Sequence, residues 1–258
     1  MKKLHYSFTV IFCVFFVSLA IFSSCRKYID YIEEEPPVKL ECTLNIPGGC
    51  LDQWMNWDDG NGFKCLEPAG NFLRSLNYLY TLPVAAGGPG PQTADSTRDS
   101  YSGKYAALLT TKSFSPMGQP ILIPGLIGTD SLDIPNATIR VGKPYTKRPI
   151  AFDGYYKYEP VNGDSALISV LLSKFNSTES KRDTIALVRA IYKNTVTTYT
   201  HIELPLTYYS TVTPDSITLL ICSSGGIRLD DLMNCKGQVG SKLWIDEISF
   251  IMPEGKKL

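Results

Sequence analysis

Histidine is nearly absent from this sequence: its 258 residues include only two, His5 and His201. A metal centre built from several histidines is therefore excluded, and a Ser-His-Asp or Cys-His arrangement in the body of the chain would have to use His201. That residue alternates with Ile202 and Leu204 in "THIELPL". Since neighbouring side chains of a strand point to opposite faces, we expect a solvated histidine on a polar strand face.

Net charge is lacking as well, because 25 basic residues balance 25 acidic ones. Nucleic-acid binding depends on a strongly basic surface that neutralises phosphates. We therefore set that class of function aside.

Long apolar runs are also missing, apart from Phe8 to Ile21, which follows the basic start of the chain. This run is short for a membrane span of about 20 residues but suits the core of a signal peptide. The small residues of "AIFSSC" before Cys25 resemble a bacterial lipobox. They predict cleavage before Cys25 and acylation of its thiol and amine, and the alternative is a plain signal peptide with an incidental cysteine.

The next stretch, Arg26 to Glu41, is charged, contains Pro-Pro and shows no lasting period, so it is typical of a tether. Its acidic residues resemble the surface-export signal of glycan-foraging Gram-negative bacteria. We predict a signal peptide over 1–24, a tether over 25–41 and one domain over 42–258. The protein would be lipid-anchored in the outer membrane and face the cell surface. Removal of the signal peptide, which contains two lysines, would leave a net charge of about −2.

Helical periodicity is scarce beyond the tether, and short β-rich runs recur between Gly, Pro, Asn and Asp. This pattern predicts an all-β fold, an antiparallel β-sandwich of the jelly-roll kind. The expected strands are Tyr105–Thr111, Ile121–Pro124, Ala137–Val141, Ile150–Tyr158, Ala166–Leu172, Thr184–Tyr192, Thr200–Leu206, Ser216–Cys222 and Leu243–Ile251. For Pro47 to Pro91 we expect an edge strand followed by long loops.

No C-x-x-C motif occurs among the five cysteines that follow Cys25, so disulfides or buried thiols are expected rather than a zinc site. Cys222 and Cys235 bracket one loop and are predicted to form a disulfide. One further pair is open among three residues, Cys42, Cys50 and Cys65.

Three segments resemble a known family, the "putative carbohydrate metabolism domain" of bacterial surface lipoproteins. They begin "LPVAAGGPGPQTADSTRDSYSGKY", "GKPYTKRPIAFDGYYKYEPVNGD" and "TYTHIELPLTYYSTVTPDS". The closing "GSKLWIDEISFI" is similar to the final strand of jelly-roll carbohydrate-binding modules. The resemblance covers about Leu44 to the C-terminus and implies a jelly roll with a role in glycan use, but no catalytic residues.

Glycoside hydrolysis needs two carboxylates facing each other across a cleft. Most acids here fall in predicted turns, and an alternating E-x-D-x-E strand is absent, so we assign no catalytic residue. An acid in the last strand of sugar-binding jelly rolls often helps to hold a structural Ca²⁺, which makes Asp246 a candidate metal ligand. The alternative for Asp246 is a surface acid or a turn former at the strand end.

Aromatic residues among polar ones are the composition of a sugar-binding surface. Trp54 and Trp57 in "DQWMNWDDGN" and Tyr101 in "RDSYSGKY" have this setting. In "AFDGYYKYE", alternation places Tyr156 and Tyr158 in the core and leaves Tyr155 among charges. We predict that at least one tryptophan is largely exposed, Trp57 before Trp54, and that Tyr101 or Tyr155 extends its platform.

The sequence thus predicts a lipid-anchored protein that binds a glycan or polysaccharide and works beside other outer-membrane proteins of glycan uptake. A glycoside hydrolase or related enzyme is the first alternative, and an adhesive or structural envelope lipoprotein is the second. The only cofactor expected is the structural calcium considered for Asp246.

Overall fold

The computed structural model describes residues 42–58, 64–81, 89–115, 118–129, 131–133, 138–140, 142–228 and 234–253. The chain divides into two units, Met1–Glu41 and Cys42–Leu258, and all described residues belong to the second. The predicted signal peptide, Cys25 and the tether lie outside the described residues. In the part of the chain that is described, no helix is both long and apolar enough to cross a membrane.

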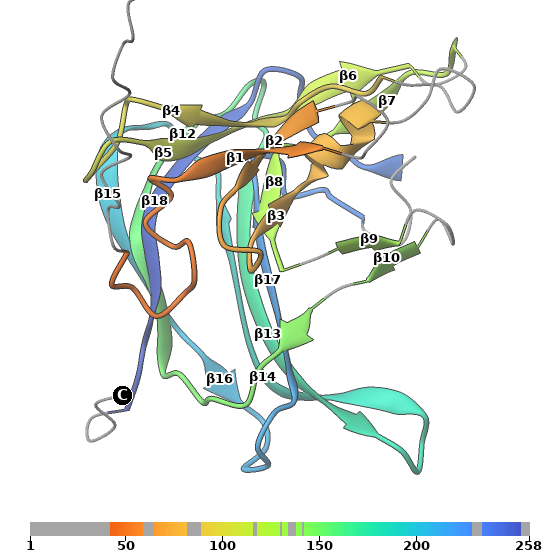
Figure 1. Ribbon diagram of the computed structural model, residues 1–258, viewed down its shortest axis with the longest axis vertical. Helices are drawn as coiled ribbons and strands as arrows, with labels where there is room; N and C mark the ends of the chain where they lie inside the picture. The colour runs from red at the N-terminus through yellow and green to blue at the C-terminus, as the bar shows by residue number, and fades with distance from the viewer. Residues whose placement is uncertain are drawn as a thin grey trace, which may run out of the picture. The chain divides into compact units, whose positions relative to one another are not determined.

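Two antiparallel sheets form a sandwich (Figure 1). The five-stranded sheet has the spatial order β15 (Val196–Pro205), β12 (Ala151–Glu159), β18 (Lys242–Ile251), β5 (Ala106–Thr110) and β4 (Ala94–Thr97). The seven-stranded sheet has the order β16 (Thr207–Tyr208), β14 (Lys181–Tyr192), β13 (Ala166–Asn176), β17 (Ser216–Cys222), β8 (Leu126–Gly128) and β3 (Arg74–Ser75), with β11 (Lys143–Pro144) also paired to β17.

Strand pairing shows a jelly roll. Taken in chain order, the principal strands are β5, β8, β12, β13, β14, β15, β17 and β18. The first pairs with the last, the second with the seventh, the third with the sixth and the fourth with the fifth. Such nested pairs arise when one long antiparallel hairpin folds over into two sheets, which is the topology of a jelly roll. The predicted jelly-roll β-sandwich is therefore confirmed.

Shorter elements lie outside the two main sheets. They are the hairpin of β1 (Trp54–Asp58) with β2 (Lys64–Pro68), the hairpin of β6 (Lys112–Phe114) with β7 (Ile121–Ile123), the pair β9 (Ser131–Asp133) and β10 (Thr138–Arg140), and one 3-10 turn, η1 (Leu76–Thr81). The region 47–91 therefore holds a hairpin and the sheet-edge strand β3, more regular structure than the single edge strand predicted.

Alternation along the strands builds the core between the sheets. In β12 the side chains of Phe152, Tyr156 and Tyr158 are buried, whereas the intervening Tyr155 is only half-buried. The Tyr158 hydroxyl donates to the Ser223 carbonyl at 3.1 Å, so this buried phenol keeps a hydrogen bond. The prediction that Tyr156 and Tyr158 belong to the core is confirmed.

The disulfide pairing differs from the prediction. Among the described residues, one disulfide is present, and it joins Cys42 to Cys50. Cys222 is turned into a second apolar cluster with Leu126 and its neighbours, while the Cys235 Sγ lies 3.3 Å from the Arg228 backbone nitrogen. The predicted Cys222–Cys235 bond is therefore wrong, because the two side chains are committed to different surroundings.

A β-bulge interrupts β18 where it pairs with β12. Asp153 faces Ser249 and Tyr155 faces Asp246, so Gly154 stands opposite both Glu247 and Ile248. Glu247 adopts a left-handed backbone conformation with φ of 50°. The extra residue keeps Ile248 in the core and turns Asp246 to the outer face of the sheet.

Candidate functional site

Polar and aromatic side chains gather on the outer face of the five-stranded sheet, the face turned away from the core. Strand register sets this arrangement, because Tyr155 of β12 lies opposite His201 of β15 and Asp246 of β18. Two residues further along β12, on the same face of the sheet, Lys157 lies opposite Trp244. Side chains directly opposite on one face lie within contact distance.

The centre of this surface is a pair of stacked tyrosines. The rings of Tyr101 and Tyr155 lie 3.5 Å apart, centroid to centroid, with an interplanar angle of 10°. Tyr199 meets Tyr101 edge-on at 6.1 Å, and His201 lies 5.1 Å from Tyr155. We call these residues and Trp244 the aromatic face.

Tyr101 is the most accessible tyrosine of the aromatic face, with 48% of its surface exposed. Stacking on Tyr155 fixes its orientation and contributes about 0.5–1.5 kcal/mol beyond area burial. The hydrogen bond with Tyr101 is the main cause that raises the pKa of Tyr155. The structure thus brings together Tyr101 and Tyr155, two of the four residues predicted from sequence to bind sugar.

Two carboxylates hold the loop that carries Tyr101. Asp246 accepts hydrogen bonds from the backbone N–H groups of Tyr101 at 2.8 Å and Ser102 at 3.2 Å. Asp52 accepts from the N–H groups of Lys104 and Tyr105. The loop is therefore tied to the sandwich at both of its halves, and the Tyr101 ring is pre-positioned.

Asp246 is fully buried beneath this loop, and burial raises the pKa of its carboxyl to about 6. Its second oxygen accepts from the Glu247 N–H at 2.9 Å. Backbone N–H groups thus bind both carboxylate oxygens, and the calcium role considered for Asp246 stays a prediction. Asp246 is not the surface acid considered from sequence; it anchors a loop.

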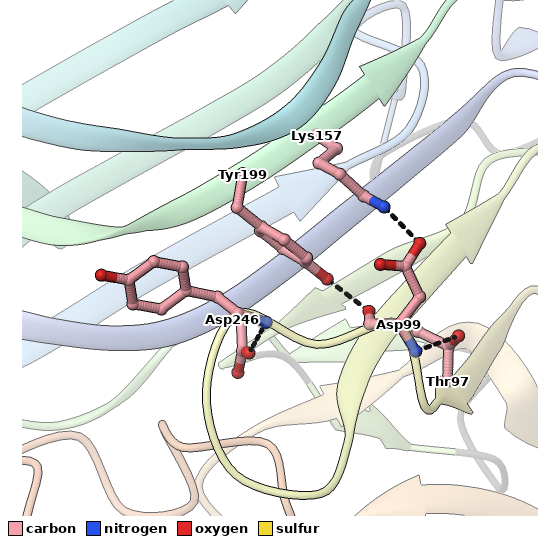
Figure 2. A network of polar contacts seen from close by, with 6 residues as sticks. Thr97, Asp99, Lys157, Tyr199 and Asp246 are labelled. Atoms are coloured by element: carbon pink, nitrogen blue, oxygen red, sulfur yellow. Dashed lines mark hydrogen bonds and ion pairs between the residues drawn. The ribbon is translucent and has the colours of Figure 1, made fainter.

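Lys157 links the loop to the strands, as Figure 2 shows. Its ammonium forms an ion pair with Asp99 and lies 4.9 Å from the Tyr199 ring centroid and 4.8 Å from that of Trp244. The Tyr199 hydroxyl donates to the Asp99 carbonyl at 2.6 Å, and the Asp99 N–H donates to the Thr97 hydroxyl at 3.2 Å (Figure 2). Burial, reinforced by nearby carboxylates, raises the pKa of Tyr199, so its hydroxyl stays a donor at neutral pH.

His201 lies on the polar face of β15, as predicted, and it is exposed. Its Nε2 is 2.6 Å from the Asp153 Oδ1, which makes a polar pair at the edge of the aromatic face. Within the described part of the chain, the pair consists of these two side chains. The pair therefore offers hydrogen-bonding groups to a ligand on the aromatic face.

The tryptophans of β1 do not join the aromatic face. Trp54 is half-buried, packs against the main core and donates from its indole nitrogen to the Leu51 carbonyl at 2.8 Å. Trp57 is half-buried and lies opposite Cys65 in the β1–β2 hairpin. The prediction that one of them is largely exposed is wrong, and among these described residues neither makes a ring contact with Tyr101 or Tyr155.

Sequence reasoning missed Tyr199, Lys157 and Trp244 as members of the site. The alternation of Tyr199 and His201 with Ile202 in the sequence indicates that the two aromatic residues share the polar face of a strand. The sequence does not indicate which strand lies beside it, because the pairing of β12 with β15 joins residues about 50 positions apart. Together these residues provide flat aromatic rings that can pack against C–H groups, with hydrogen-bond donors and acceptors beside them. Such a surface is suited to binding sugar rings.

Comparison with known proteins assigns the family. Residues 52–251 match the model of the "Putative carbohydrate metabolism domain", and the chain belongs to this family. The family relates the chain to carbohydrate metabolism, as its sequence resemblance implied. No curated protein matches the chain significantly.

Two solved structures share the fold. One, described as a "putative glycoside hydrolase" from Bacteroides thetaiotaomicron, is 20% identical with a TM-score of 0.57, over 78% of this chain and 67% of the other. Another of the same description, from Bacteroides vulgatus, is 18% identical with a TM-score of 0.57, over 78% of this chain and 91% of the other. At this identity the likeness establishes the architecture of the domain.

Proposed function

We propose that the protein binds a glycan on the aromatic face and holds it at the bacterial envelope through a lipid on Cys25. The observation that carries the proposal is the Tyr101 ring, half exposed and stacked on Tyr155. A sugar ring can lay its C–H face on such a plane while its hydroxyl groups reach the Asp153–His201 and Lys157–Asp99 pairs.

The position of Tyr101 also favours binding. Exposed aromatic rings held rigidly by their neighbours lose little conformational entropy when a ligand covers them. Tyr101 is held by its stack and by the Asp246 carboxylate under its backbone. Its rigidity is the property expected of a binding platform.

The anchor and the partners rest on the sequence of the first 41 residues. The lipobox-like "AIFSSC" and the charged tether support an outer-membrane lipoprotein with its domain at the cell surface. In that place a glycan-binding domain would deliver polysaccharide to the outer-membrane proteins that take it up.

Affinity electrophoresis of the full chain in detergent, through gels containing different polysaccharides, tests the proposal. Tyr101→Ala should weaken retention by at least about tenfold, roughly 1.4 kcal/mol. The matched control is Tyr209→Ala, which removes another exposed tyrosine, 64% accessible and outside the aromatic face.

Equal retention of the two variants on every polysaccharide that retains the wild type would place the glycan site elsewhere. The two structural neighbours described as "putative glycoside hydrolase" suggest hydrolysis as a second candidate function, and an assay of the same polysaccharides for new reducing ends tests it. Release of reducing sugar ends by the wild type would show a hydrolase instead of a binding protein.

A further inference from the structure

A hollow lies at the end of the sandwich where β12 begins and β18 ends. Its volume is about 580 Å³, within the range of about 300–1,000 Å³ common for small-molecule sites. It is lined by Thr146, Lys147, Arg148, Ile150, Tyr208, Thr213, Met252 and Pro253. None of these residues belongs to the aromatic face.

The described lining of this cavity carries positive charge that no described carboxylate balances. Arg148 lies 4.2 Å over the Tyr208 ring, and its guanidinium donates to the backbone carbonyls of Ser210, at 2.8 Å, and Val212. These partners are neutral, so they orient the guanidinium without cancelling its charge. Among the described residues no carboxylate pairs with Arg148 or with the exposed Lys147, and the cavity lining contains no acid.

The remaining lining is amphipathic. Tyr208, Met252 and Pro253 supply apolar surface. Ile150, the residue just before β12, is 49% exposed and adds to it. Hydroxyl groups come from two threonines of the lining. Apolar planes, hydroxyls and two cations together match a ring that has C–H faces, hydroxyl groups and a carboxylate.

We propose that this cavity binds a uronic acid, either as a free sugar acid or as one residue of an acidic polysaccharide. The carboxylate lies between Lys147 and Arg148, and the sugar ring packs on the apolar lining. Charge-assisted hydrogen bonds to a carboxylate are the strongest polar contacts such a site can make, and Arg presents its donors in a planar fork. The neutral aromatic face and this cationic cavity then bind different parts of a glycan.

Isothermal titration of the full chain in detergent tests the cavity, with galacturonate, a galacturonate trimer and the neutral sugar galactose as probes. Galacturonate or its trimer should bind at least roughly tenfold more tightly than galactose, the size expected for one charge-assisted contact. Raising the salt to about 0.5 M should weaken that binding, since screening reduces the attraction between charges.

Lys147→Gln should weaken uronate binding by roughly tenfold, because it removes one cation while keeping a side chain of similar length. The matched control is Lys193→Gln, an exposed lysine between β14 and β15, at the end of the sheet where Tyr158 pairs with Val196. It lies away from the cavity, where Ala151 pairs with Pro205, and should leave binding unchanged.

Binding of the trimer alone would assign the cavity to a residue within a polysaccharide, and binding of both acids would include the free sugar. Failure of both acids to bind more tightly than galactose overturns the proposal. Equal losses in the Lys147→Gln and Lys193→Gln proteins overturn it as well. Neither failure bears on the aromatic face, because Lys147→Gln removes a charge from the cavity alone.

Discussion

Protonation of Asp246 should contribute more to the stability of the fold in mild acid than at neutral pH. Its carboxyl is fully buried, and burial raises its pKa from an ordinary 3.8 to about 6, against the opposing effect of the N–H groups of Ser102 and Tyr101. The folded protein therefore holds this proton more tightly than the unfolded chain does. The stability that protonation contributes is complete below about pH 4 and is lost as the pH rises through about 6.

The size of the effect follows from the two pKa values. A difference of about two units, at about 1.4 kcal/mol per unit, gives roughly 3 kcal/mol. At pH 4.5 the carboxyl is already mostly protonated in the fold. Lowering the pH from about 7.5 to about 4.5 should therefore raise the free energy of unfolding by about 2 kcal/mol through Asp246 alone.

Asp246→Asn isolates this contribution, because an amide of the same shape cannot titrate. Urea unfolding followed by tryptophan fluorescence at both pH values gives the difference between wild type and variant, and any constant cost of the lost acceptor cancels. That difference should change by about 2 kcal/mol between the two pH values. The control Asp95→Asn removes an exposed carboxylate of β4 and should leave the pH dependence of stability near that of the wild type. Identical pH dependence in wild type and Asp246→Asn would refute the raised pKa.

Two further predictions concern cysteines. Cys42→Ser removes the disulfide to Cys50, which lies eight residues further along the chain. From the chain entropy of this loop, the free energy of unfolding should fall by about 2.5 kcal/mol. Thermal unfolding measures this loss, and an unchanged melting temperature would contradict it. Cys25→Ser removes the expected acylation site and should release the protein from membranes or stall its processing, as fractionation of cells will show. Recovery of that variant with outer membranes would mean that a lipid on Cys25 is not the anchor.

Local alternation predicted which tyrosines of β12 are buried, because the pattern depends only on the strand itself. Tyr156 and Tyr158 point inward with Phe152, and Tyr155 points outward, as the order of residues in "AFDGYYKYE" requires. Likewise, the β-rich runs and turn residues were enough to indicate a sandwich. Both successes concern information contained in short stretches of chain.

Contacts between distant segments were not predictable in the same way. Tyr101 reaches Tyr155 from a loop that is tied to Asp246, which is 145 residues further along the chain. Trp57 had the composition of a sugar-binding residue, yet hairpin pairing with β2 places it beside Cys65. The spacing that favoured a Cys222–Cys235 disulfide failed for a similar reason, because burial of Cys222 in an apolar cluster depends on segments outside that loop.

A single extra residue in β18 decides how the aromatic face is assembled. Counted strictly by alternation from the buried Phe250, Ile248 and Asp246 would both point inward, and a carboxylate would enter the core. The bulge at Glu247 shifts the alternation, so Ile248 remains inside while Asp246 turns outward under the Tyr101 loop. Two adjacent acids between Ile245 and Ile248 are the trace of this shift in the sequence. Because the loop that presents Tyr101 depends on Asp246, the position of the proposed sugar platform is set by this bulge as much as by the tyrosines themselves.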